Sequence, residues 1–172
     1  MAVQTNARIL IIDDQESCAH FLEKLLERAG YAICITMTDP AVAVARMVEL
    51  APDLVLLDLM MEPMSGLDVL RAIRETIPAR LRPPVLVMTG DTTPEAKHDA
   101  LAAGATDFLS KPFDSVETLL RIKHILDARS LFQQCQTYSE SLEGLVSKRT
   151  ATLQEQTSDL EKTLAELRET QQ

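Results

Sequence analysis

The sequence predicts an α/β fold in which helices cover both faces of a parallel sheet, followed by one long helix. Up to about residue 129, short apolar runs rich in branched residues alternate with longer stretches of helical periodicity. This order is typical of a parallel sheet with crossover helices. The runs ILII and LVLL are continuously apolar, as in strands covered on both faces. After residue 129 Gln, Glu, Ser, Thr and Leu dominate and proline is absent, which predicts a helix instead of a second globular domain.

Five short segments are expected to form the strands of the sheet. Each is apolar and is bounded by turn-forming or polar residues. They lie at residues 8–12, 32–37, 54–57, 85–88 and 107–109. Together with the helical stretches between them, they predict one α/β domain over residues 1–129.

Helical periodicity marks the stretches between these strands. The first helix ends before Gly30, a typical helix stop, and its apolar stripe consists of Cys18, Leu22, Leu25, Leu26 and Ala29. A third helix is expected from near Gly66, and its inward residues are Leu70, Ile73 and Ile77. A fourth, weakly patterned helix is expected at residues 94–103.

The second and fifth helices have recognisable first residues. Asp39-Pro40 combines an N-cap residue with proline in the first turn, and the residues expected to be buried behind it are Ala41, Val44, Ala45 and Val48. Residues 114–117 have capping-box spacing, so the fifth helix is expected to begin there. Its apolar residues spread over more than one face, which indicates that a partner covers the face turned away from the sheet.

Residues 130–172 are expected to form a coiled-coil helix that continues the fifth helix. An eleven-residue leucine repeat runs through it, flanked by a row of Tyr138, Arg149 and Leu160, and its members are Leu131, Leu142, Leu153 and Leu164. This period corresponds to 3.67 residues per turn and predicts a straight or slightly right-handed coiled coil. Heptad fragments fit the same seam, at Tyr138, Leu142, Leu145 and at Leu160, Leu164, Leu167. A helix this polar gains little stability alone, so we expect a parallel homodimer in preference to a free solvated helix.

Composition and charge narrow the class of protein. Hydrophobic residues make up 46% and charged residues 25% of the chain, which is typical of a soluble globular protein. The net charge of −9 leaves no basic face for nucleic acid, so no direct nucleic-acid contact is expected. No apolar run reaches the ~20 residues of a membrane span, and no secretory signal is recognisable. Three cysteines without metal-ligand spacing suit reduced thiols, and we expect a cytoplasmic location.

Polar residues stand where the expected strands end. Asp13 and Asp14 follow the first strand, Asp58 the third, Thr89 the fourth and Lys111 the fifth. Because the carboxyl ends of parallel strands meet at one edge of a sheet, we expect these side chains to share a small space. Three acids repel one another unless a divalent cation lies among them, and oxygen ligands favour Mg²⁺. The sequence therefore predicts a magnesium site at this edge.

Beside Mg²⁺, a carboxylate can act as a nucleophile toward a phosphoryl donor. Asp58 is the expected acceptor because it stands alone at the end of its strand, whereas the adjacent Asp13 and Asp14 are better placed to hold the cation. Lys111 and Thr89 would bind the oxygens of the transferred group. The pattern favours phosphoryl transfer to a protein carboxylate.

Four motifs occur in a specific order along residues 8–127. They are ILIIDD at the first strand, LVLLDLMMEPMSGLDVL around Asp58, VLVMTG at the fourth strand and DFLSKPF at the fifth. In this order they resemble the receiver domains of response regulators in two-component signalling. The resemblance implies a flavodoxin-like doubly wound sheet of strand order 2-1-3-4-5. It also implies phosphorylation of Asp58 and Mg²⁺ ligation by Asp14, by Asp13 in the outer shell, by Asp58 and by the backbone carbonyl of Met60.

The resemblance assigns roles to further residues as well. Thr89 and Lys111 would bind phosphoryl oxygens, and Lys111-Pro112 would be a cis peptide. Phe108 would be the switch aromatic, which turns inward when Thr89 moves toward the phosphoryl group. These assignments place a conformational switch beside the expected acceptor.

Two positions depart from the family pattern. Glu62 stands four residues after the acceptor, where most members have proline, and Pro63 follows it. Gly90 follows Thr89 in place of the usual alanine, which loosens this loop. Neither departure removes a reacting group.

These features predict a phosphorylation-controlled response regulator. A partner histidine kinase or phosphotransfer protein would donate the phosphoryl group to Asp58, and an output module would read a changed helix or dimer geometry. The chain would catalyse only its own phosphorylation and dephosphorylation. The segment LVSKRTATL resembles linkers that lead into cyclic-dinucleotide enzymes or histidine-kinase modules, and no such module is expected within these residues.

Two alternatives belong to other classes of protein. A receiver-fold scaffold or adaptor would act through the coiled coil without phosphorylation, but the intact acidic and lysine positions argue against it. A phosphatase with an aspartyl nucleophile would usually carry a second acid where this chain has Met60. Family behaviour suggests that Met60 and Asp91 govern water access, so we expect slow hydrolysis of the phosphoryl group. No chemistry is assigned to the histidines, which lack ligand spacing: His20, His98 and His124.

Overall fold

A five-stranded parallel sheet forms the centre of the fold. The computed structural model describes residues 6–91 and 93–169, with side chains described as far as residue 157 apart from residue 155. The strands lie in the order β2-β1-β3-β4-β5, which confirms the expected doubly wound sheet. Their bounds are β1 Arg8–Ile12, β2 Ile33–Met37, β3 Leu54–Asp58, β4 Val85–Thr89 and β5 Asp107–Ser110. Each expected strand is present, with ends that differ by at most one residue.

The strand register brings the carboxyl ends of the strands to one edge. Asp58 at the end of β3 pairs with Met88, and Thr89 at the end of β4 pairs with Ser110. β1 ends at Ile12, so Asp13 begins the loop at the same edge. The residues expected to carry chemistry therefore follow or end adjacent strands.

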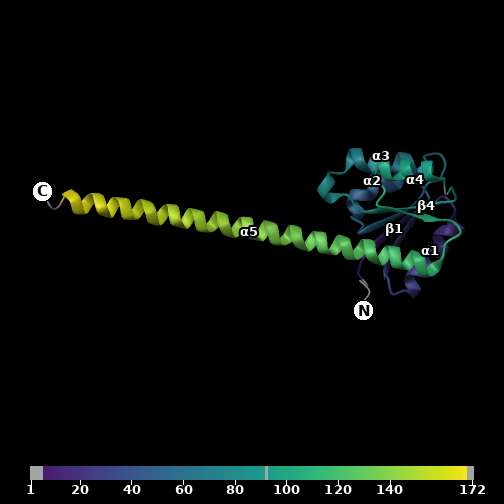
Figure 1. The fold of residues 1–172 in the computed structure, drawn as a ribbon, viewed down its shortest axis with the longest axis horizontal. Helices are drawn as coiled ribbons and strands as arrows, with labels where there is room; N and C mark the ends of the chain where they lie inside the picture. The colour runs from purple at the N-terminus through teal and green to yellow at the C-terminus, as the bar shows by residue number, and fades with distance from the viewer. Residues whose placement is uncertain (1–5, 92, 170–172) are drawn as a thin grey trace. The chain divides into compact units, whose positions relative to one another are not determined.

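Helices cover both faces of the sheet. Their bounds are α1 Glu16–Arg28, α2 Pro40–Leu50, α3 Gly66–Thr76, α4 Pro94–Ala103 and α5 Ser115–Glu169, with a short 3₁₀ turn, η1, at Ala79–Leu81. Figure 1 shows α2, α3 and α4 on one face and α1 with the first turns of α5 on the other. Successive residues of each strand point to opposite faces, and the sheet therefore contributes to two separate cores.

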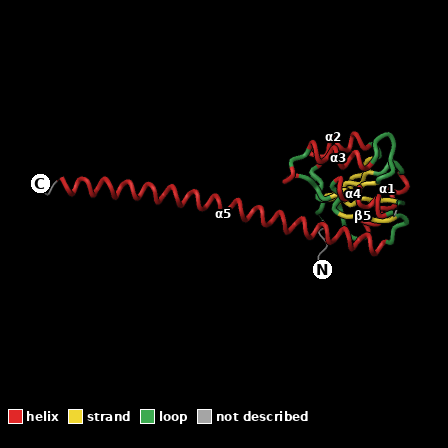
Figure 2. Tube along the Cα trace, turned by 45° about the horizontal axis from the view of Figure 1, so that its top comes forward, coloured by secondary structure: helices red, strands yellow, loops and turns green. Residues whose placement is uncertain are grey.

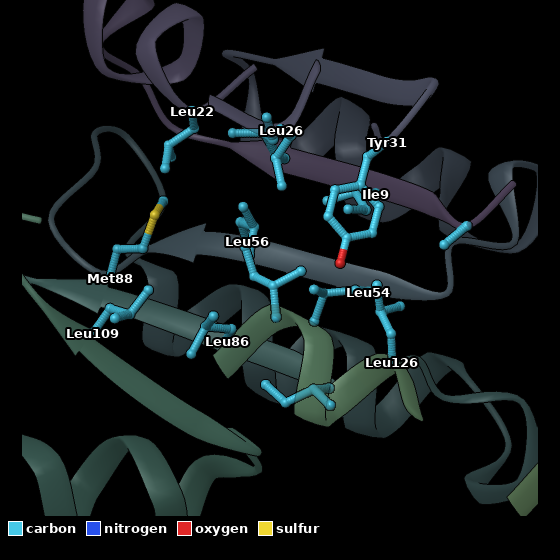
Figure 3. Packing of buried hydrophobic residues seen from close by; sticks show 14 of the residues in the cluster. Ile9, Leu22, Leu26, Tyr31, Leu54, Leu56, Leu86, Met88, Leu109 and Leu126 are labelled. Carbon is cyan, nitrogen blue, oxygen red and sulfur yellow. The ribbon is translucent and has the colours of Figure 1, made fainter. Parts of the chain in front are cut away.

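The core beneath α1 and α5 is formed by alternate strand residues and by apolar helix residues (Figure 3). Leu22 and Leu26 of α1 and Ile122 and Leu126 of α5 pack against β1, β3 and β4. The second core lies beneath α2, α3 and α4 and takes the other strand residues, among them Leu10, Val55, Leu57 and Val87. Because these strands are buried on both faces, their sequences are continuously apolar.

Capping residues determine where the helices begin. The carboxylate of Asp39 accepts hydrogen bonds from the backbone N–H groups of Ala41 and Val42, with Pro40 in the first turn of α2. The Thr93 hydroxyl caps α4 through the N–H of Ala96. These side chains satisfy N–H groups that have no partner within the helix, and the expected start of α2 is confirmed.

The predicted buried face of α2 is wrong. The helix buries Pro40, Ala43 and Met47, whereas Val48 is 65% exposed and Val44 is only partly buried. The other two residues expected inside, Ala41 and Ala45, are exposed. Apart from Arg46 and Glu49, every residue of α2 is apolar. The spacing of apolar residues therefore does not define an inward stripe. By contrast, the inward residues expected in α3 are confirmed: Leu70, Ile73 and Ile77 are buried.

α5 is one unbroken helix through its described residues (Figure 2). Its first part buries Ile122, Ile125 and Leu126 but leaves Val116 and Leu120 exposed, so apolar surface remains away from the sheet. The contacts between residues separate the chain into two units, one that ends at Arg129 and one that begins at Ser130.

The second unit carries the leucine repeat. Its large apolar side chains are exposed at Leu131, Tyr138, Leu142, Leu145 and Leu153. The remaining expected seam side chains, Leu160, Leu164 and Leu167, lie outside the described side chains. Within the described residues, no helix is apolar over a length that could cross a membrane.

Candidate functional site

A lysine joins two acidic strand ends at the carboxyl edge of the sheet. The Lys111 ammonium donates a hydrogen bond to Asp58 Oδ2 at 2.8 Å and lies 3.4 Å from Asp13 Oδ2. The side chains of Asp13 and Asp58 are 0% and 1% exposed. Buried carboxylates require hydrogen bonds or opposite charge, and the lysine supplies both.

Three carboxylates gather around this lysine. Oxygen atoms of Asp13, Asp14 and Asp58 lie within 4.8 Å of one another. Asp13 Oδ1 accepts the N–H of Gln15 at 2.9 Å, and Asp58 Oδ1 accepts the N–H of Met60 at 3.3 Å. One ammonium group cannot balance three carboxylates, so the cluster retains an excess of negative charge.

The environment of Asp14 indicates whether the acidic cluster could hold a divalent cation. Asp14 Oδ1 is buried and has no hydrogen-bond partner in the described part of the chain. A buried acceptor without a partner requires an explanation such as an ion or a water molecule. The hard oxygen donors of this acidic cluster are those that Mg²⁺ prefers. The donor set therefore fits the magnesium ion that the sequence predicts.

The charge state of Lys111 follows from two opposing effects. Burial disfavours the ammonium form and would lower the pKa of Lys111, but the hydrogen bond that the ammonium donates to Asp58 and the charges of Asp58 and Asp13 outweigh it. The pKa of Lys111 is therefore raised above its ordinary value. At neutral pH the lysine is an ammonium ion that can bind anionic oxygen.

A match to a known protein family agrees with this arrangement of residues. The model of the response regulator receiver domain matches residues 9–123. The chain belongs to this family.

Curated relatives agree with the assignment. The alkaline phosphatase synthesis transcriptional regulatory protein PhoP of Bacillus subtilis is 36% identical over 121 residues, which are 70% of this chain and 49% of that protein. The cell cycle transcriptional regulator CtrA of Caulobacter vibrioides is 32% identical over 120 residues, or 69% of this chain and 50% of that protein. The chain thus spans about half the length of the curated relatives it matches.

Solved structures agree as well. The chemotaxis protein CheY4 of Vibrio cholerae superimposes with a TM-score of 0.64 at 30% identity, covering 70% of this chain and 98% of that protein. A receiver domain from Bermanella marisrubri superimposes with a TM-score of 0.63 at the same identity, covering 70% of this chain and 98% of that one. Control by phosphorylation is the general function of this family, and the resemblance noted in the sequence is confirmed.

Within this receiver domain, the Thr89 side chain is held by its own loop. Its hydroxyl donates to the carbonyl of Asp91 at 3.1 Å and accepts the N–H of Asp91 at 3.0 Å. Thr89 is buried at the end of β4, the strand beside the one that Asp58 ends. Within the described residues its hydroxyl forms no hydrogen bond with the three carboxylates. The hydroxyl must exchange these partners before it can bind a new group.

Two cations on neighbouring elements lie over the ring of Phe108. The Lys97 ammonium is 4.7 Å from the ring centroid and the Arg121 guanidinium carbon is 5.9 Å from it. Arg121 is itself held by Asp107 at 2.6 Å. Cations over an aromatic face are attracted by its electron density, so this arrangement stabilises the partly exposed ring where it is.

Three features near the site were not expected from the sequence. Glu62-Pro63 is a cis peptide in addition to the expected Lys111-Pro112. The backbone N–H of Glu62 donates to Asp14 Oδ2 at 3.3 Å. Burial, together with a hydrogen bond to Asp13, raises the pKa of Cys18 to about 12, so this thiol stays protonated beside the cluster. The helical stripe placed Cys18 near the core, but no sequence pattern indicates its contact with Asp13.

Proposed function

We propose that Asp58 accepts a phosphoryl group from a partner histidine kinase or phosphotransfer protein, and that Mg²⁺ assists the transfer. The observation that carries this proposal is the hydrogen bond of the Lys111 ammonium to Asp58 at 2.8 Å, within a cluster of three carboxylates. A buried nucleophile and the cation that pairs with it thus lie together at the carboxyl end of β3.

The chain supplies the nucleophile and part of the charge stabilisation. A carboxylate oxygen of Asp58 forms a bond to phosphorus while the bond from phosphorus to the histidine nitrogen breaks, and its electron pair stays on the imidazole. Lys111 binds a phosphoryl oxygen as a point charge, and Thr89 offers its hydroxyl to another after leaving Asp91. The product is an acyl phosphate on Asp58.

The acidic residues would hold the cation. Asp14 and Asp58 would ligate Mg²⁺ directly with the carbonyl of Met60, and Asp13 would act from the outer shell. When bound, Mg²⁺ supplies positive charge that neutralises the oxygens of the transferring group. The unpartnered Oδ1 of Asp14 supports this assignment.

The switch would connect Asp58 to the surface of α4, β5 and α5. Movement of Thr89 toward the phosphoryl group vacates space near β5, and Phe108 leaves the cations Lys97 and Arg121 to fill it. Phosphorylation adds about −1.5 to −2 charges at this edge. This added charge would drive the movement of Thr89 and Phe108.

The receiver domain would occupy residues 1–129, and residues 130–172 would form a parallel homodimeric coiled coil. The exposed side chains of Leu142, Leu145 and Leu153 support this assignment, because apolar residues repeated on a polar helix are typical of an association seam. The switch would alter helix or dimer geometry for an output module.

We further propose a cytoplasmic protein whose described segment makes no direct contact with nucleic acid. The acidic net charge of −9 supports this, because nucleic-acid binding relies on basic surfaces. Several relatives are named transcriptional regulators, and they extend well beyond the region that matches this chain.

The phosphoryl group is proposed to hydrolyse slowly. Met60 is 70% exposed directly beside the acceptor strand, where its apolar side chain can exclude attacking water. Asp91 is exposed in the loop after Thr89. A half-life of seconds for the phosphorylated protein would contradict this assignment.

Intact mass spectrometry tests the proposed transfer. The full chain is incubated with a small phosphodonor, with and without Mg²⁺, beside the variant Asp58→Asn. We expect one added phosphoryl group on the wild type only, and only with Mg²⁺. A scaffold that acts without phosphorylation would show no added mass on either protein.

A further inference from the structure

The two oxygens of the Asp14 carboxylate have different surroundings. Asp14 Oδ2 accepts the backbone N–H of Glu62 at 3.3 Å. Asp14 Oδ1 is buried and has no hydrogen-bond partner in the described part of the chain. A single donor on one oxygen fixes the rotation of the carboxylate and leaves the other oxygen free for a different partner.

The donor exists because residue 62 is not proline. Proline has no backbone N–H, and in this chain proline follows at Pro63. The contact therefore requires the departure from the family pattern at this position.

The backbone of Glu62, and not its side chain, makes this contact. The Glu62 side chain is exposed, and the group of carboxylates near enough to share a metal ion does not include it. A substitution that keeps the N–H but removes the carboxylate would leave the contact to Asp14 in place.

We propose that the backbone N–H of Glu62 is a positioning group that turns Asp14 Oδ1 toward a divalent cation and couples cation binding to the loop between β3 and α3. The inference rests on the proposed function, because the cation is the one that phosphoryl transfer uses. Groups that hydrogen-bond to a metal ligand orient it, and their loss weakens metal binding by about 10- to 100-fold.

Two substitutions at one position separate the backbone from the side chain. Glu62→Pro removes the N–H, and Glu62→Ala keeps it while removing the carboxylate. Isothermal titration of each full-length unphosphorylated protein with MgCl₂ gives the dissociation constant. We expect Glu62→Ala to bind Mg²⁺ within about twofold of the wild type and Glu62→Pro to bind about tenfold more weakly, at the lower end of the range for such groups.

The kinetics of phosphorylation supply a second readout. At saturating Mg²⁺ we expect Glu62→Pro to reach the wild-type rate, with a raised Mg²⁺ concentration for half-maximal rate. Equal Mg²⁺ affinity of Glu62→Pro and the wild type would overturn this inference and leave the proposed phosphoryl transfer in place. An equal loss in both variants would also overturn it, because the side chain would then be responsible.

Hydrogen exchange tests the contact without altering the loop. The Glu62 amide belongs to an exposed residue, yet it should exchange slowly in the wild type and rapidly in Asp14→Ala. Rapid exchange in the wild type would overturn the inference even if Glu62→Pro fails to fold. A wild type that takes no Mg²⁺ and no phosphoryl group would overturn the proposed function and this inference together.

Discussion

Gly66 packs against the backbone of Asp58 with no space for a side chain. A Cβ atom on Gly66 would lie 2.7 Å from Leu59 Cα and closer still to the carbonyl oxygen of Asp58. The N–H of Gly66 also donates to the carbonyl of Leu59 at 3.0 Å. The first residue of α3 is therefore held against the end of the strand that carries the proposed acceptor.

This contact predicts a cost for Gly66→Ala. The methyl group meets backbone atoms, which cannot move aside as a flexible side chain can, and overpacking of this kind costs about 1–3 kcal/mol. Urea unfolding of the two proteins measures the difference. Gly90→Ala is the control, because a Cβ there meets nothing within 4 Å. Equal stability of Gly66→Ala and the wild type would contradict the close approach.

The first turn of α3 predicts a pH dependence of stability. The Ser65 hydroxyl donates to Asp68 at 2.6 Å and accepts its N–H, while Arg71 binds the same carboxylate at 2.8 Å. The Ser65 hydrogen bond, assisted by Arg71, lowers the pKa of Asp68. A carboxylate with a depressed pKa in the folded state stabilises the fold above its unfolded pKa, and this contribution is lost as pH falls through the folded value.

We therefore expect the wild type to exceed Asp68→Asn in stability at neutral pH and to lose this advantage below about pH 4, where an aspartate begins to take up a proton. The measurement is the free energy of unfolding of both proteins at a series of pH values. A difference that stays constant from pH 7 to pH 3 would show that the charge of Asp68 does not contribute.

The position of Phe108 predicts a fluorescence signal. The chain has no tryptophan, so Phe108→Trp introduces a single probe at the ring that Lys97 and Arg121 contact. If phosphorylation turns the ring inward, the emission maximum should shift to shorter wavelength when a phosphodonor and Mg²⁺ are added. The same probe in an Asp58→Asn background should not respond. Unchanged emission from fully phosphorylated protein would rule out this movement of the ring.

The exposed leucines of α5 predict a dimer that two substitutions disrupt. Leu142 and Leu145 are more than half exposed, and charge in an apolar seam opposes association. We expect the wild type to have twice the mass of one chain in light scattering and Leu142→Asp with Leu145→Asp to have the mass of one chain. Ser147→Asp, on the other side of the helix, is the matched control. A wild type with the mass of a single chain would contradict the coiled-coil assignment.

Elements with a clear amphipathic pattern were predictable from the sequence. α3 alternates apolar and charged residues, so its inward residues could be assigned, among them Leu70 and Ile73. α2 is apolar on nearly all sides, and only tertiary packing decides that Met47 lies inside and Val48 outside. The burial of such a helix depends on the shape of its neighbours, which spacing does not contain.

The convergence of the site residues was predictable from the topology of the sheet. Parallel strands bring their carboxyl ends together, so Asp13, Asp58 and Lys111 could be expected to meet, and they do. The contacts of Asp14 with Glu62 and of Phe108 with Lys97 depend on loop conformation and on side-chain rotamers. A sequence pattern specifies neither, and both contacts emerge only from the structure.

Chemical mapping of the phosphoryl group shows whether Asp58 is the acceptor. After incubation with a phosphodonor and Mg²⁺, borohydride reduction converts an acyl phosphate into a stable alcohol, and peptide mass spectrometry identifies the residue that carried it. We expect reduction at Asp58 alone in the wild type and no reduced acidic residue in Asp58→Asn. Reduction at a different carboxylate, or an unmodified Asp58 in protein that has gained a phosphoryl group, would show that Asp58 is not the acceptor.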